Sequence, residues 1–248
     1  MAGHSHSANI AIRKGAQDKK RAKLFSKLAK EIIIATKLGD PDPDTNPRLR
    51  LALRKAKSQS LPKATIERAI KKGSGELAGD DYQELIMEGY GPGGTAVYVE
   101  VMTDNRNRAA SEIRHAFAKG GGNLGTSGCV GYMFERKGVI SVVGEEEEVM
   151  MTALDAGAED VSDNGDGTID VLTESNDCES IAKALTDAGF ELKADEVMFV
   201  PDNRVAVSGK SAGQLLRMLD MLDDCDDVQK LTHNADFDQA SLEAFANS

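Results

Sequence analysis

The apolar residues in the first part of the chain recur at helical spacing. Those that repeat at steps of three and four positions are Leu24, Leu28, Ile32, Ala35 and Leu38. On a helix with 3.6 residues per turn they form one stripe, and the lysines of the same stretch fall together on another face. The pattern therefore predicts an amphipathic helix over residues 16–38, which Gly39 ends.

Two shorter helices are expected after this one. Asn46-Pro47 is typical of an N-cap residue followed by proline at the first helical position. A third helix is expected to begin at Leu61-Pro62 and to end at Gly73. The Gly- and Ser-containing residues 73–80 have the composition of a hinge, so the three helices should form a small bundle of their own.

Beyond the hinge the pattern changes to a mixture of strands and helices. Thr95–Met102 is rich in β-branched and aromatic residues, which favours a strand. Next we expect a helix over residues 106–119 and a strand over residues 129–134. The end of the chain predicts a strand, a helix and a strand at residues 204–207, 212–222 and 228–233.

The residues between these two groups form a self-contained run. Their predicted order is β-α-β-β-α-β, which is that of a ferredoxin-like unit. The strands are expected at residues 138–143, 159–162, 168–173 and 196–200, and the helices at 145–156 and 176–188.

These elements predict an α+β protein of three domains. The first is a basic three-helix domain at residues 1–78. The other two are ferredoxin-like α/β domains, with the third inserted into the second. The second domain is discontinuous and comprises residues 79–134 and 204–248, and the inserted domain comprises residues 135–203.

The charge of the chain is divided between its two ends. Residues 1–75 hold 18 Lys and Arg against 6 Asp and Glu, a net of +12, and the remaining residues hold 12 against 35, a net of −23. The overall charge of −11 hides this division. A basic module on an acidic body is typical of a protein that binds a polyanion at one end.

The basic helices are the candidate phosphate-binding surface. Between Arg13 and Lys30 there are eight basic residues and a single acid, Asp18. Neutralising phosphates is the chemistry that such a density favours, and six to eight contacts would cost about three to four decades of affinity between low and physiological salt. The residues expected to bind phosphate are Arg13, Lys14, Lys19, Lys20, Arg21, Lys23, Lys27, Lys30, Arg48, Arg50, Arg54, Lys55 and Lys57.

The same cations have two other interpretations. Lysines along a helix face are often only a solvated surface. The basic domain could also dock on the acidic body of its own chain, which the hinge would permit. That arrangement would be an autoinhibited state, and salt would open it.

A second polar cluster lies around the helix expected at residues 106–119. Its spacing places Arg106, Asn107 and Arg114 near one face, and we expect them beside the glycine-rich loop at residues 120–125. This suits a contact with phosphate or an RNA backbone, whereas an N-cap and a salt-bridged surface would explain the same residues without a ligand. The cluster comprises Asp104, Asn105, Arg106, Asn107, Arg108, Arg114 and His115.

Several classes of function lack support in the sequence. No run of 18 apolar residues exists, so no helical membrane span is expected. Cys129, Cys178 and Cys225 are far apart and form no C-x-x-C motif, which fits a reducing cytoplasm without disulfides or a zinc site. No nucleophile and base occur at useful spacing. We therefore expect no enzyme, catalytic residue, cofactor, metal or small-molecule substrate.

Several short motifs resemble those of one known family. They are Met1-Ala2-Gly3-His4-Ser5, Asn46-Pro47-Arg48-Leu49-Arg50, Glu88-Gly89-Tyr90-Gly91-Pro92-Gly93-Gly94, Asp104-Asn105-Arg106-Asn107-Arg108 and Gly121-Gly122-Asn123-Leu124-Gly125. From residue 1 to about 235 the chain is similar to the YebC/PmpR family, which includes the mitochondrial translational activator of cytochrome oxidase.

The resemblance implies three domains, with the third inserted into the second, and no enzymatic activity. Members of the family are commonly described as DNA-binding transcriptional regulators. Others act in translation on the ribosome, where they ease synthesis through proline-rich stretches.

Three functions are consistent with these observations. The first is a cytoplasmic DNA-binding transcriptional regulator. The second is a ribosome-associated translation factor that binds ribosomal or transfer RNA. The third is an adaptor whose basic domain binds an acidic protein. No helix-turn-helix spacing is clear, and a surface that binds phosphates serves DNA and RNA alike, so the sequence does not separate the first two.

Overall fold

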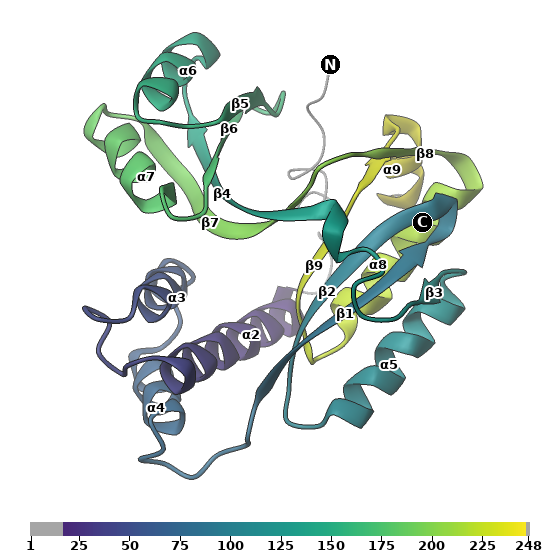
Figure 1. The fold of residues 1–248 in the computed structure, drawn as a ribbon, viewed down its shortest axis with the longest axis horizontal. Coiled ribbons are helices and arrows are strands. Elements are labelled where there is room, and N and C mark those ends of the chain that lie inside the picture. The colour runs from purple at the N-terminus through teal and green to yellow at the C-terminus, as the bar shows by residue number, and fades with distance from the viewer. Residues whose placement is uncertain (1–16, 247–248) are drawn as a thin grey trace.

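The computed structural model describes residues 17–246, with side chains described from Arg21 onward. The first described region is helical (Figure 1) and consists of α2 (Gln17–Leu38), α3 (Pro47–Ser58) and α4 (Lys63–Gly73). The three helices enclose an apolar core around Ile32, Leu49 and Leu53, where α2 contacts both shorter helices. The three predicted helices are therefore confirmed, and we call this part the helical region.

Asn46 joins α2 to α3. Its Oδ1 accepts a hydrogen bond from Leu49 N at 3.0 Å, as predicted for an N-cap, and Pro47 follows at the first helical position. Its Nδ2 donates to Ala35 O and Asp40 O, both at 2.8 Å, at the end of α2. One buried side chain thus satisfies backbone groups of both helices.

We expect Asn46→Ala to lower the free energy of unfolding by about 2–3 kcal/mol, because it removes the cap and leaves two carbonyls without a donor. Urea denaturation followed by circular dichroism measures this loss. Asn46→Ser keeps a cap acceptor and loses only the two donated bonds, so its loss should be smaller. Equal losses in the two variants would contradict a role in capping.

The second part of the chain is built on a four-stranded antiparallel sheet, here called the first sheet, with the order β3-β1-β2-β9. The helices α5 and α8 pack against one face of it, over a core that contains Val99, Phe117 and Leu215. These elements are β1 (Gln83–Gly91), β2 (Thr95–Thr103), α5 (Arg106–Lys119), β3 (Asn123–Leu124), α8 (Gly209–Asp224) and β9 (Val228–His233).

Three short elements complete this part. The strand β8 (Val205–Val207) lies outside the first sheet and pairs in parallel with β10 (Ala235–Phe237), and α9 (Gln239–Ala246) follows. The two 3-10 turns are η1 (Pro92–Gly94) and η2 (Gly131–Met133).

Between β3 and β8 the chain builds the second sheet. Its order, β5-β6-β4-β7, is antiparallel throughout, and it is the order predicted for the ferredoxin-like unit. Its elements are β4 (Phe134–Val143), α6 (Glu146–Asp155), β5 (Asp160–Asp163), β6 (Thr168–Glu174), α7 (Cys178–Asp187) and β7 (Glu191–Pro201). The strands that enter and leave it are paired at its neck, where Phe134 faces Pro201 and Asp202 N donates to Met133 O at 3.0 Å.

The α+β class with a helical N-terminal region is confirmed. The ferredoxin-like order is complete only in the second sheet, because the first sheet starts with a hairpin of β1 and β2, and β8 does not join it. The strand predicted at residues 129–134 is wrong. Backbone bonds from Cys129 N and Met133 N close two turns there, and β4 begins only at Phe134. The domain boundaries stay predictions.

No helix in the described part of the chain combines the length and the apolar character needed to cross a membrane.

Candidate nucleic-acid interface

The lysines of α2 face the acidic end of α8. Lys23 Nζ lies 3.2 Å from Asp224 Oδ1, and Lys27 Nζ lies 3.2 Å from Asp223 Oδ1. The contact extends to the backbone, since Gln229 Nε2 donates to Lys27 O at 2.6 Å. Two of the predicted phosphate-binding lysines are therefore held by carboxylates about 200 positions away in the sequence.

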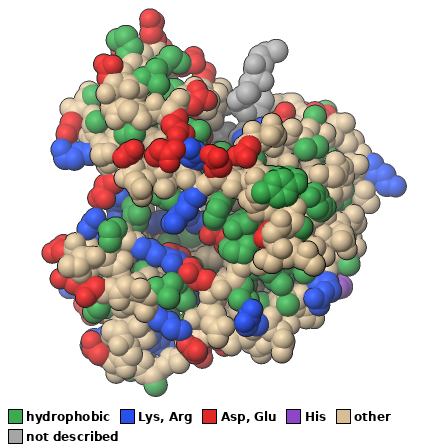
Figure 2. Space-filling model, in the orientation of Figure 1, with side chains coloured by type: hydrophobic (Ala, Val, Ile, Leu, Met, Phe, Trp, Pro, Cys, Tyr) green, Lys and Arg blue, Asp and Glu red, His purple; other side chains and the backbone are tan. Residues whose placement is uncertain are grey.

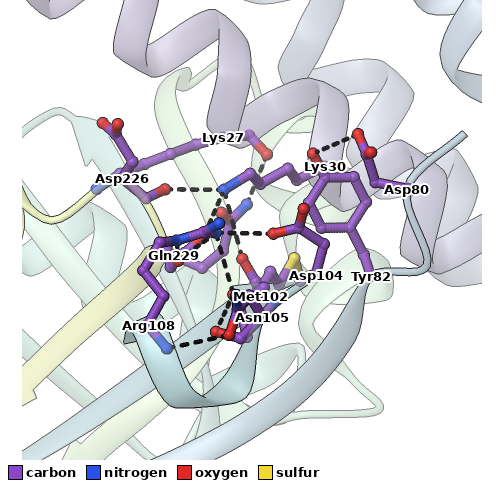
Figure 3. A network of polar contacts seen from close by, with 12 residues as sticks. Lys27, Lys30, Asp80, Tyr82, Met102, Asp104, Asn105, Arg108, Asp226 and Gln229 are labelled. Atoms are coloured by element: carbon purple, nitrogen blue, oxygen red, sulfur yellow. Dashed lines mark hydrogen bonds and ion pairs between the residues drawn. The ribbon is translucent and has the colours of Figure 1, made fainter. Parts of the chain in front are cut away.

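Lys30, on the same helix, lies in a buried network (Figure 3). Its Nζ donates to Asp227 Oδ1 at 3.2 Å, to Asp226 O at 2.9 Å and to Met102 O at 3.4 Å. The Asp227 side chain is 2% exposed, and it also accepts from Arg108 Nε and Nη2 at 3.1 and 2.8 Å. All three ammonium donors of Lys30 are thus used within the protein, and we correct its assignment from a phosphate ligand to a structural residue.

The cations of α3 face the second sheet. Arg54 Nη2 lies 2.7 Å from Asp195 Oδ2, an ion pair without hydrogen-bond alignment, and Lys55 Nζ donates to Glu196 Oε1 at 2.5 Å. Burial raises the pKa of Asp195. Arg50, which donates to Pro43 O, also lies 3.5 Å from Glu179. Ion pairs thus join the helical region to α8 and to the two elements α7 and β7 of the second sheet's part.

Arg48 links the helical region to β1. Its Nε donates to Glu31 Oε1 at 2.9 Å within the helical region, and its two terminal nitrogens donate to the carboxylate of Glu84. Burial lowers the pKa of Arg48, but the hydrogen bonds to Glu84 and Glu31 outweigh it, so the pKa is raised.

The remaining predicted cations are placed differently. Arg21 is exposed, with its guanidinium 5.2 Å from the ring centre of Phe25. Lys57 is exposed and forms no ion pair among the described residues. The structure describes the backbone but not the side chains of Lys19 and Lys20 in α2, and Arg13 and Lys14 lie outside the described residues.

Sequence reasoning did not single out the cations of α4. Arg68 and Lys71 are exposed there without an ion pair in the described part of the chain, and Lys63 lies 3.8 Å from Glu67 one turn away. Their signal was weak because they alternate with the apolar positions of a short helix. The excess of positive charge in residues 1–75 nevertheless includes them.

The second polar cluster divides into two groups. Asn105 caps α5 by accepting from Arg108 N at 3.1 Å, and Arg108 pairs with Asp104 and Asp227. The hydrogen bond from Arg108 holds the pKa of Asp104 below its usual value. The second group is exposed and has no ion pair among the described residues; it comprises Arg106, Asn107, Arg114 and His115.

The expected proximity of this cluster to the glycine-rich loop is wrong for its first residues. Arg106 begins α5 and Gly120 follows its end. At a rise of about 1.5 Å per residue, the two ends of the helix are roughly 20 Å apart. The structure therefore assembles no single site from Arg106 and the loop at residues 120–125.

Positive charges of the helical region face negative charges of the second sheet on the surface. Figure 2 shows Lys and Arg side chains in the hollow between the helical region at lower left and the second sheet at upper left, and Asp and Glu side chains along that sheet. Most of the pairs that cross this boundary are half-exposed, as in Lys55 with Glu196 at 41% and 32%. Exposed pairs of this kind contribute about 0–1 kcal/mol each, so a phosphate can replace the carboxylate at little cost.

Two family models match most of the chain. A model of the TACO1/YebC protein N-terminal domain matches residues 5–76, and a model of the TACO1/YebC second and third domain matches residues 82–235.

Individual relatives are similar over nearly their whole length. A probable transcriptional regulatory protein of Desulfatibacillum aliphaticivorans is 52% identical over 95% of this chain and 96% of its own. One of Thermotoga maritima is 49% identical over 98% and 97%. The crystal structure of a conserved hypothetical protein from Aquifex aeolicus matches with a TM-score of 0.86 and 44% identity, over 95% of this chain and 98% of that one.

Proposed function

The chain belongs to the TACO1/YebC family, and we propose that it is a non-enzymatic regulator of gene expression that binds nucleic acid through its helical region. The observation that carries the proposal is the concentration of a net charge of +12 in residues 1–75 of a chain whose remainder carries −23. Such a stripe of cations supplies sequence-independent affinity for phosphates.

The proposed contacts fall into two sets. The open set consists of exposed cations without an acidic partner among the described residues, namely Arg21, Lys57, Arg68 and Lys71. The paired set consists of cations held by acids of α7, β7 and α8, namely Lys23, Lys27, Arg50, Arg54 and Lys55. The open set makes the first contacts with a phosphate backbone. The paired set joins as phosphates replace the carboxylates.

This exchange makes the acidic body part of the binding equilibrium. When the paired set is held by these acids, the helical region is docked on the acidic body of its own chain. The sequence left this docked state open as an alternative. Because the carboxylates occupy the cations that phosphates would use, the two compete, and weak or short polyanions bind poorly. The acids thereby raise the threshold for non-specific binding.

DNA and RNA both remain candidate ligands. Relatives are named probable transcriptional regulatory proteins, which favours DNA. No helix-turn-helix spacing is clear in the sequence, so specific reading of a DNA duplex has no support from a known motif. The alternative is therefore a ribosome-associated factor that binds ribosomal RNA with the acidic body directed away from it.

We expect the affinity for a single-stranded RNA and for a duplex DNA of equal length to fall by about three decades between 50 and 200 mM salt, roughly as six phosphate contacts predict. Fluorescence anisotropy with labelled oligonucleotides measures this slope. The double variant Arg68→Gln, Lys71→Gln should reduce the salt dependence of the affinity by the share that about two phosphate contacts contribute. Lys183→Gln with Lys193→Gln is the matched control on the second sheet, and should leave it unchanged.

Co-sedimentation with ribosomes then separates the two ligands. Pelleting at physiological salt, where duplex binding has vanished, would favour the translation factor. A preference of about a thousandfold for one duplex sequence would favour the transcriptional regulator. If neither nucleic acid is bound at low salt, the proposal fails and an acidic protein partner is the remaining interpretation.

A further inference from the structure

Tyr132 is unlike the other aromatic residues of the chain. The sequence has 4 Tyr, 7 Phe and no Trp, and all lie within the described residues. Ten of the eleven are buried or half-buried, whereas Tyr132 is 72% exposed. It lies in η2, where the chain passes from the first sheet to the second. A single exposed apolar residue is ordinary on a protein surface, so the surroundings of Tyr132 decide its meaning.

The loop that carries Tyr132 is fixed by a buried carboxylate. Glu88 on β1 is 5% exposed, and its two oxygens accept from Gly128 N at 2.8 Å, Val130 N at 2.9 Å and Gly131 N at 2.6 Å. Burial alone would raise the pKa of Glu88, but these three backbone bonds outweigh it and lower the pKa. Glu88 therefore binds the loop both before and after Cys129, and Tyr132 is the next residue after Gly131.

A second tyrosine also anchors the loop that carries Tyr132. Tyr90 Oη donates to Cys129 O at 3.0 Å, within the same loop. Burial raises the pKa of Tyr90, and the neighbouring Tyr132 side chain raises it further. Tyr132 thus lies near a tyrosine that is anchored to the same loop, while most of the residue is open to solvent.

Two glycines precede Tyr132 in the loop, and neither has a side chain. Gly128 has a φ of +85°, and a Cβ on Gly131 would lie 3.2 Å from Glu88 Oε2, so both positions favour glycine. The whole stretch from Gly120 to Phe134 contains no charged residue, although residues 76–248 carry a net of −23. An uncharged stretch does not itself attract phosphate, but a largely exposed aromatic ring held on it suits the flat face of a nucleobase.

We propose that Tyr132 is a stacking platform for an unpaired nucleobase, and that the loop at residues 125–133 holds it in a fixed position. The inference rests on the proposed function, since the helical region would supply the affinity for the backbone of the same strand. Tyr132 would then favour a single strand over a duplex, because the bases of a duplex are already stacked on each other.

The test compares Tyr132→Ala and Tyr132→Phe with the wild-type chain. The probes are a labelled oligouridylate of about twelve nucleotides and a duplex DNA of equal length, in anisotropy titrations at one salt concentration. We expect Tyr132→Ala to weaken binding of the oligouridylate by about tenfold or more and to leave the duplex unchanged. Tyr132→Phe keeps the stacking face and should bind as the wild type does.

Tyrosine fluorescence gives an independent readout, because the chain has no Trp. Stacking of a base on Tyr132 should quench part of the emission on binding, and Tyr132→Phe should lose that part while keeping its affinity. Met151→Ala removes another exposed apolar side chain, 64% exposed on α6, and is the matched control. It should change neither readout.

The outcomes distinguish this inference from the proposed function. If wild type binds the oligouridylate and Tyr132→Ala binds it equally well, the stacking platform is overturned and the proposed function stands. Equal weakening of oligouridylate and duplex would also overturn it, since it would indicate a general change in the loop. If wild type binds neither probe, both proposals fail.

Discussion

Asp227→Asn is expected to lower the free energy of unfolding by about 3–5 kcal/mol, because it breaks a buried ion pair and leaves a charge without its partner. The Lys30 side chain is 9% exposed and that of Asp227 is 2% exposed, so water cannot replace the lost carboxylate. Arg108 is less affected, since it is half-exposed and also pairs with Asp104. Urea denaturation at constant pH measures the change.

The matched control for this variant is Asp224→Asn. Asp224, the last residue of α8, pairs with Lys23 of α2, but its side chain is 78% exposed, so we expect a loss below about 1 kcal/mol. Adding Lys30→Met to Asp227→Asn should recover part of the stability, because no lysine charge is then left buried. If the two Asp→Asn variants lose the same stability, burial does not determine the strength of this network.

Removing the carboxylates that hold the paired cations should raise the affinity for nucleic acid about tenfold at low salt. Four exposed or half-exposed pairs at a few tenths of a kcal/mol each make up this factor. The variant combines Asp195→Asn, Glu196→Gln, Asp223→Asn and Asp224→Asn. Anisotropy titration with a single-stranded RNA at matched salt measures the gain, which should shrink as salt screens both interactions.

A second variant separates this competition from the effect of net charge. Glu146→Gln, Glu147→Gln, Glu148→Gln and Asp155→Asn change the charge by the same amount on α6, where these acids are exposed and form no ion pair with the helical region. This variant should only reduce the general repulsion between the protein and the nucleic acid, so its gain in affinity should be smaller. If both variants gain equally, the ion pairs do not compete with phosphate.

The sequence was sufficient wherever local pattern decides structure. The amphipathic stripes fixed the three N-terminal helices, and Asn46-Pro47 marked the start of α3 because capping is a local interaction. The order of the second sheet followed from alternating strand and helix patterns separated by clear turns. Helical periodicity and capping are decided within a few residues, which is why these elements could be predicted from the sequence.

The sequence failed where distant residues decide. The strand β1 was missed because Glu84 and Glu88 interrupt its apolar pattern, and nothing nearby reveals that Glu88 is buried against backbone donors 40 to 43 positions away. Residues 129–134 have the apolar content of a strand, but the same donors turn them into a loop. Lys30 could not be told from Lys27 by spacing, since its partner Asp227 lies 197 positions further on.

The pairing of β4 with β7 at the neck of the second sheet affects the order in which the two sheets unfold. Because β4 and β7 are hydrogen-bonded where they leave the first sheet, the inserted part has adjacent ends, like a domain spliced into a surface turn. If the second sheet unfolds alone, the connection between β3 and β8 changes from a tight one to one that contains an unfolded loop of roughly 65 residues. At about 0.6 kcal/mol for each doubling of length, that penalty is only about 3 kcal/mol. The first sheet can therefore stay folded after the second sheet has unfolded.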